Sequence, residues 1–145
     1  MKKQALADAD RKRILSKVDE MERYVSELSD MLPEEKGYLS DIIRRRACEK
    51  TVELAIEALV DSAALVVSSG RMGIPSSEEN ILDILEEKKA IGPALTDKLK
   101  NMKGFRNILV HRYGKINDKE TYRFLKEDLG DFTEYRKAIM SYMNK

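Results

Sequence analysis

The stretch Met102-Lys103-Gly104-Phe105-Arg106-Asn107-Ile108-Leu109-Val110-His111-Arg112-Tyr113 guides the interpretation of the whole chain. With Leu95 and Leu99 before it, its apolar residues recur at three- and four-residue steps, which predicts an amphipathic helix. Its last two turns hold an Arg-x4-His-x-Tyr string formed by Arg106, His111 and Tyr113, and this histidine is the only one among 145 residues. Because histidine ionises near neutral pH, the search for acid–base chemistry begins here.

The same helical spacing extends over most of the chain and predicts an all-α, antiparallel bundle of about five helices, folded as one domain over residues 1–145. Proline, glycine and capping residues mark the helix ends. The expected helices span Asp8–Met31, 40 or 41 to 69, 78–89, 93–113, 117–129 and 132–143. A capping box at Ser76-Ser77-Glu78-Glu79 begins the third of them, and a break at Gly130-Asp131 precedes the last. A connector is expected between the first two helices.

The composition excludes several classes of protein. With 27 basic and 26 acidic residues the net charge is +1, so any nucleic-acid site must be a local patch. The lone Cys48 excludes a disulfide framework and a cysteine-based zinc site, and agrees with a reducing compartment. No stretch approaches the roughly 20 apolar residues that span a bilayer. We therefore expect a cytoplasmic protein without a membrane partner.

Arg106 falls within the apolar stripe of its helix, where we expect it to be enclosed. A buried guanidinium is costly unless a carboxylate or an anionic ligand meets it. His111 lies about 140° around an ideal helix from Arg106, whereas Asn107 and His111 share one polar edge. For Arg106 and His111 to meet one ligand, the helix must kink, the arginine must reach far, or a second subunit must contribute.

Arginine and histidine without nearby metal ligands suit the metal-independent cleavage of RNA. This reaction needs a base for the 2′-hydroxyl, a proton for the leaving 5′-oxygen and a cation for the phosphate. Arg106 and His111 match two of these roles. Since one chain has one histidine for two proton transfers, a two-fold homodimer with a shared cleft is expected. The alternative is that water or another group serves as the acid.

A local basic strip supports an anionic ligand. Between positions 98 and 115 there is no acidic residue, and the basic residues are Lys98, Lys100, Lys103, Arg106, Arg112 and Lys115. Of these, Lys98, Lys103, Arg112 and Lys115 are the candidate RNA-binding residues, and Phe105 or Tyr113 could stack on a base. The alternative is a solvated helix end whose basic residues favour the helix dipole.

Four carboxylates at four-residue spacing, Glu49, Glu53, Glu57 and Asp61, are expected on one flank of the second long helix. Such like charges are mildly unfavourable on a helix. Either they face water, or one of them pairs with Arg106 and holds its guanidinium in place.

The Arg106-x4-His111-x-Tyr113 string, the stretch around it and the preceding long helix resemble a HepT-type toxin of the HEPN superfamily. Such proteins are ribonuclease partners of minimal nucleotidyltransferase (MNT) antitoxins. The resemblance implies a homodimeric helical bundle with Arg106 and His111 of both protomers at a metal-free, cofactor-free RNase site, and with Asn107 as a polar helper. It also implies that an MNT antitoxin transfers AMP from ATP onto Tyr113 and so blocks RNA.

A second function of a different class remains open. The chain could be a non-catalytic helical module that binds a nucleotidyltransferase partner or a nucleotide. Tight binding of such a partner without RNA cleavage would distinguish this function from that of a nuclease.

Overall fold

A computed structural model of the chain describes residues 6–111 and 116–145, and the regular structure in these ranges is helical throughout. The helices of this described part are α1 (Asp8–Met31), α2 (Glu35–Ser40), α3 (Ile42–Ser69), α4 (Glu78–Glu87), α5 (Pro93–His111), α6 (Asp118–Glu127) and α7 (Gly130–Met143). The expected all-α class is confirmed. None of these helices combines the length and apolar character that crossing a membrane requires.

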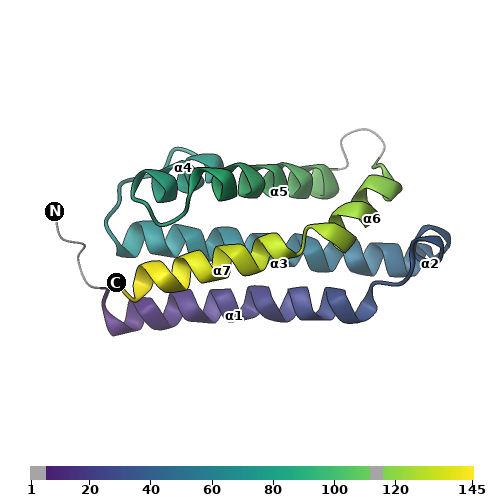
Figure 1. Ribbon diagram of the computed structural model, residues 1–145, viewed down its shortest axis with the longest axis horizontal. Helices are drawn as coiled ribbons and strands as arrows, with labels where there is room; N and C mark the ends of the chain where they lie inside the picture. Colours follow the sequence, from purple (N-terminus) through teal and green to yellow (C-terminus); the bar gives the residue numbers. More distant parts are fainter. Residues whose placement is uncertain (1–5, 112–115) are drawn as a thin grey trace.

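The four longest helices, α1, α3, α5 and α7, form a closed bundle (Figure 1). In this bundle α1 packs against α3, α3 against α5, α5 against α7, and α7 against α1. The colours of Figure 1 show that successive members run in opposite directions, as an antiparallel bundle requires. Since α4 packs on both α3 and α5, helix α5 lies between α4 on one side and α7 on the other.

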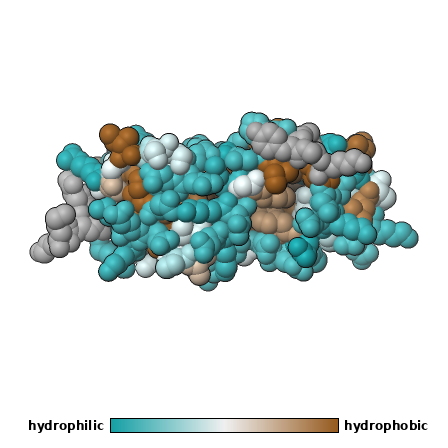
Figure 2. All heavy atoms as spheres, turned by 90° about the horizontal axis from the view of Figure 1, so that it is seen from above, coloured by the Kyte–Doolittle hydropathy of each residue, from teal (hydrophilic) through white to brown (hydrophobic). Residues whose placement is uncertain are grey.

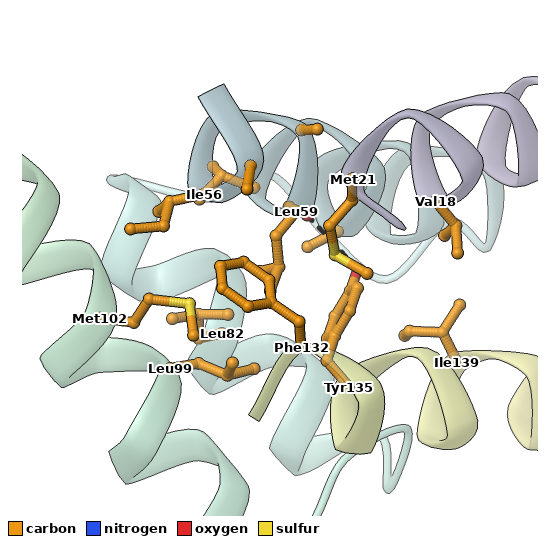
Figure 3. Close-up of a cluster of buried hydrophobic side chains, with 14 of the residues drawn as sticks. Val18, Met21, Ile56, Leu59, Leu82, Leu99, Met102, Phe132, Tyr135 and Ile139 are labelled. Atoms are coloured by element: carbon orange, nitrogen blue, oxygen red, sulfur yellow. Dashed lines mark hydrogen bonds between the residues drawn. The ribbon is translucent and has the colours of Figure 1, made fainter. Parts of the chain in front are cut away.

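Side chains of α4 and of all four bundle helices meet in one apolar core, shown in Figure 3. The labelled residues are at most 2% exposed: Val18, Met21, Ile56, Leu59, Leu82, Leu99, Met102, Phe132, Tyr135 and Ile139. The hydroxyl of Tyr135 lies 2.6 Å from that of Ser62, so the polar end of this buried aromatic residue is satisfied. Because Leu99 and Met102 point into this core, the rotation of α5 about its axis is fixed.

Capping residues begin several helices where the sequence predicts them. Asp41 precedes α3 and accepts a hydrogen bond from the Arg44 backbone N–H (3.1 Å). Asn117 precedes α6 and accepts from the N–H groups of Lys119 and Glu120, both at 3.1 Å. These contacts confirm the predicted starts of the two helices.

The described part of the chain contains seven helices, more than the expected five or so, partly because the connector after α1 is itself helical. Helix α2 has six residues, too few to show a helical period in the sequence. Long-range contacts hold it instead. The buried Tyr38 packs against Tyr122 with ring centroids 5.2 Å apart, and Arg45 donates to the carbonyl of Leu39 at 2.5 Å.

Candidate functional site

Arg106 lies in the buried stripe of α5, among the core-facing Leu99, Met102 and Leu109. Its side chain is 13% exposed, which confirms the predicted enclosure. A charged group in such surroundings needs partners within the protein, since it has lost most of its contact with water.

The partners of the guanidinium are Glu78 and Asn107. Through Nη2, Arg106 donates to the carboxylate of Glu78, at the start of α4, and to Oδ1 of Asn107 at 3.2 Å. Its Nε atom is buried and has no hydrogen-bond partner among the described residues. The contacts that hold this cation are therefore concentrated on one nitrogen.

Glu78 owes its place to the cap of α4. Ser77 is the N-cap and accepts from the backbone N–H of Asn80 at 3.0 Å, while Oδ1 of Asn80 accepts from the Ser76 N–H, also at 3.0 Å. The cap is therefore shifted by one residue from the predicted box: Ser77 rather than Ser76 is the N-cap, and Asn80 rather than Glu79 is the returning side chain. Glu78 and Glu79 fall in the first turn, where negative charge favours the helix dipole.

Ion pairs join α4 to α5 along their antiparallel contact. Those within the described ranges are Arg106 with Glu78, Lys103 with Glu79 (3.9 Å) and Lys100 with Asp83 (2.5 Å). The hydrogen bond that Lys100 donates to the carboxylate of Asp83 raises the pKa of Lys100. Three members of the predicted basic strip are therefore already opposite carboxylates of the same chain.

Lys98 lies apart from the other described members of the strip. Its Nζ is 3.4 Å from the carboxylate of Glu134, on α7, whereas Lys103 faces α4. The two lysines thus lie on different sides of α5. The structure does not bring them together as one surface.

The sequence predicts that the four carboxylates at four-residue spacing on α3 face water or that one of them pairs with Arg106, and the structure contradicts part of this. Glu49 is buried and pairs with Arg46 at 3.0 Å, so not all four of these carboxylates face water. Glu53 pairs with Lys50 and Asp61 with Lys17. Arg106 pairs with Glu78 instead of any of them, because α4 packs on α5 and places Glu78 against its guanidinium.

His111 is the last residue of α5 and is exposed. The long Arg106 side chain is directed to Glu78 and Asn107, so its reach is not used toward the end of the helix. The contacts that Arg106 makes with the described residues therefore lie on the α4 side of α5 and beside Asn107.

The end of α5 is less enclosed than expected. Ile108 and Val110 are 42% and 45% exposed, because α4 begins opposite Arg106 and leaves the last turn of α5 uncovered. Figure 2 shows apolar atoms at the end of the molecule where α5 and α6 approach each other, beside a mostly hydrophilic surface. The histidine therefore lies next to apolar surface.

A groove of about 370 Å³ lies between α5 and α6. Phe105 and Phe124 stack in it with ring centroids 4.5 Å apart, and Ile108 and Ile116 also line it. One face of Phe105 is covered by Phe124, which limits its use as a stacking platform for a base.

Three predicted site residues, Arg112, Tyr113 and Lys115, lie outside the described residues. Within residues 6–111 and 116–145, no three His, Cys, Asp or Glu side chains are grouped so that they could hold a metal ion.

The main residue that the sequence interpretation missed is Glu78. The sequence predicts a helix cap at this position, and the carboxylates it offers as partners of Arg106 lie on the preceding long helix. One feature of the sequence points to this pairing. Acidic residues occur in the stretch that forms α4, and basic residues occur every three positions in the stretch that forms α5. Only the antiparallel packing of α4 on α5 turns these two patterns into contacts.

Comparison with known proteins gives a consistent result. The model of the family described as "Ribonuclease HepT-like" matches residues 21–139. The chain is 25% identical over 126 residues to the mRNA nuclease HepT of Shewanella oneidensis, covering 87% of this chain and 95% of that protein. It is 29% identical over 97 residues to the putative RNase YutE of Bacillus subtilis, covering 67% of each.

Solved structures show the same fold. A tri-AMPylated HEPN toxin of Shewanella oneidensis, in complex with its MNT antitoxin, matches with a TM-score of 0.84 and 24% identity, over 88% of this chain and 96% of that one. The cytosolic protein YutE of Bacillus subtilis matches with a TM-score of 0.80 and 24% identity, over 97% and 94%.

Proposed function

The chain belongs to the HepT-like ribonuclease family, and we propose that Arg106 and His111 of two protomers form its RNA-cleavage site. Its activity is that of an endoribonuclease, the toxin of a toxin–antitoxin pair. One observation carries the assignment of the site. Arg106 is buried and held by Glu78 and Asn107, while His111 is exposed at the end of the same helix.

The proposed reaction is an internal displacement at the phosphate. The ribose 2′-oxygen attacks the adjacent phosphorus, and the bond from phosphorus to the 5′-oxygen breaks. His111 of one protomer accepts the proton of the 2′-hydroxyl, and protonated His111 of the second protomer donates a proton to the leaving 5′-oxygen. Arg106 stabilises the negative charge that gathers on the phosphate oxygens. These steps need two imidazoles and a cation, and no metal ion.

Asn107 supports this site in two ways. Its Oδ1 accepts from Nη2 of Arg106, which restricts the guanidinium. It also lies one helical turn before His111, so its side chain can contact the same ligand.

The two-histidine scheme proposed here uses a homodimer, since one chain carries a single histidine. The apolar side chains of Ile108 and Val110, exposed beside His111, suit contact with a second copy of the chain. A two-fold axis near the end of α5 brings both histidines to one cleft.

RNA is the proposed substrate, bound through phosphate contacts. Lys103 is supported as one contact by its place on the α4 side of α5, which it shares with Arg106. Lys98, Arg112 and Lys115 are proposed from the charge pattern of the sequence. Such contacts confer affinity without reading the base sequence.

We propose an MNT-type nucleotidyltransferase as the antitoxin. In the proposed modification the Tyr113 hydroxyl attacks the α-phosphate of ATP, pyrophosphate leaves, and AMP remains on the tyrosine, where its bulk and charge block RNA. Support comes from the tri-AMPylated Shewanella toxin and its MNT partner. Mass spectrometry after incubation with the cognate antitoxin and ATP should find the AMP on Tyr113. AMP addition that persists in Tyr113→Phe would contradict this assignment.

One observation favours the second candidate function, a non-catalytic module that binds a nucleotidyltransferase or a nucleotide. Glu78 already neutralises Arg106, as expected of a structural ion pair. In that case the chain would bind its partner without cleaving RNA.

Induced expression in bacterial cells separates these functions. Wild type and His111→Ala are expressed in parallel, and growth and total RNA integrity are followed together. The nuclease assignment predicts growth arrest with RNA decay for the wild type alone. Intact RNA and unimpeded growth with soluble, folded wild-type protein would support the binding module instead.

A further inference from the structure

Glu78 differs from Glu79 and Asp83 of α4 in the kind of side chain that it pairs with on α5. Glu79 and Asp83 pair with Lys103 and Lys100 through flexible lysine side chains. Glu78 instead meets a planar guanidinium that is 13% exposed. Because the five donors of arginine have a fixed geometry, one anchored nitrogen orients the whole group.

The backbone that carries Glu78 is fixed by the rest of α4. Glu78 lies in the first turn of α4, directly after the capped Ser77, and α4 is anchored to the core by the buried Leu82 and Leu85. Its side chain remains 41% exposed, so it lies where the buried guanidinium meets the surface. The backbone from which Glu78 reaches Arg106 is therefore held in place by the cap and by the core.

The contacts of Arg106 with the described residues use only part of its hydrogen-bond donors. Nη2 has two hydrogens, and its contacts are the carboxylate of Glu78 and Oδ1 of Asn107. The contacts that the described residues make with this guanidinium both fall on Nη2. Since Nε is buried, Nη1 is the nitrogen left for an incoming phosphate oxygen. An arginine that is already oriented loses less conformational entropy when it meets the transition state.

We propose that Glu78 is a positioning residue for RNA cleavage: it holds Nη2 of Arg106 so that the guanidinium presents Nη1 to the scissile phosphate. The inference rests on the proposed function, since it assigns Arg106 to the phosphate. Glu78 acts only through Arg106 and does not touch the reacting atoms.

The test compares Glu78→Ala and Glu78→Gln with the wild type, using a short RNA of defined sequence. Glutamine keeps an acceptor oxygen for Nη2, whereas alanine removes it. Glu87→Ala, at the exposed far end of α4, is the matched control. We expect Glu78→Ala to lower kcat by about 10- to 100-fold with KM changed by less than about 3-fold, since misplacing a stabilising group acts mainly on the transition state. Glu78→Gln should recover most of the loss, and Glu87→Ala should match the wild type.

A second measurement does not depend on activity. The Arg106 Nε–H signal in ¹H–¹⁵N NMR, assigned with Arg106→Lys, reports whether the guanidinium is held in one position. It should shift or broaden in Glu78→Ala and stay near its wild-type position in Glu87→Ala. An unchanged signal, or an unchanged kcat in Glu78→Ala, would overturn the proposal. Equal losses in Glu78→Ala and Glu78→Gln that follow their melting temperatures would also overturn it, because such losses indicate a purely structural role.

The two proposals fail in different ways. If the wild type does not cleave RNA, the proposed function fails, while the NMR measurement still shows whether Glu78 orients Arg106. If the wild type cleaves RNA and His111→Ala does not, but Glu78→Ala cleaves normally, the nuclease assignment stands and the role of Glu78 is refuted.

Discussion

The guanidinium of Arg106 and the carboxylate of Glu78 join the two helices that form the candidate site, α5 and α4. This contact places a buried cation at a fixed position one and a half turns before His111. Because the guanidinium is already oriented, it does not have to reorganise when a phosphate binds. Such preorganised charges stabilise a developing negative charge most effectively.

Arg106→Lys should therefore abolish most activity although it keeps the positive charge. A lysine ammonium cannot hold the planar arrangement that reaches Glu78, Asn107 and a phosphate together. We expect kcat to fall by about 100-fold or more, as for loss of one transition-state donor, with a small change in melting temperature. Arg136→Lys on α7, where Arg136 pairs with Glu22 at the surface, is the control and should stay active. Activity near the wild-type level in Arg106→Lys would show that charge alone suffices.

Ile108→Glu combined with Val110→Glu should convert the protein to a monomer. Both side chains are exposed beside His111, and two buried carboxylates at a two-fold interface would face their symmetry copies. Light scattering should then give the monomer mass of 16.7 kDa, and RNA cleavage should be lost. Ile74→Glu serves as the control, because Ile74 is 96% exposed in the loop before α4. A wild-type protein that is monomeric at micromolar concentration would refute the shared site.

Lys103 and Lys98 should differ in their contribution to RNA binding, because they lie on different sides of α5. In a His111→Ala background that binds without cleaving, Lys103→Gln should reduce the slope of log affinity against log salt by about 0.7, the value for one phosphate contact with a single strand. Lys98→Gln should leave the slope unchanged. The opposite result would move the RNA path toward α7.

Stability should fall in alkaline solution because of two buried tyrosines. Burial is the main cause that raises the pKa of Tyr38 and of Tyr135. Above about pH 10 the unfolded chain loses these protons while the folded chain keeps them, so the free energy of unfolding falls by up to about 1.4 kcal/mol per pH unit for each residue. Tyr135→Phe should make the decline shallower, whereas Tyr24→Phe, on a half-buried tyrosine of α1, should not. Equal slopes in Tyr135→Phe and the wild type would contradict this prediction.

Much of the fold could be predicted because its signals are local. Helix α1 has the bounds that its apolar spacing and Pro33 indicate, and the caps at Asp41 and Asn117 begin α3 and α6 as expected. Helix α2 could not be predicted in this way. It is held by Tyr38 packing against Tyr122, a contact between residues far apart in the chain.

In the candidate site, too, the features set by local sequence could be predicted, whereas those set by packing between helices could not. The sequence predicts a buried Arg106 that needs an anionic partner, because burial follows from helical spacing and the need for a partner from desolvation. It does not predict that the partner is Glu78, since several carboxylates satisfy the same need. The choice depends on α4 packing antiparallel to α5, which the local pattern does not encode.

Cleavage of a defined RNA by purified wild type and His111→Ala, with excess chelator present, tests the central claim most directly. The account predicts that the wild type cuts the RNA without metal ions and leaves 2′,3′-cyclic phosphate ends. His111→Ala, folded and dimeric, should leave the RNA intact. Equal cleavage by both proteins, or no cleavage by a folded and dimeric wild type, would contradict a His111-dependent ribonuclease.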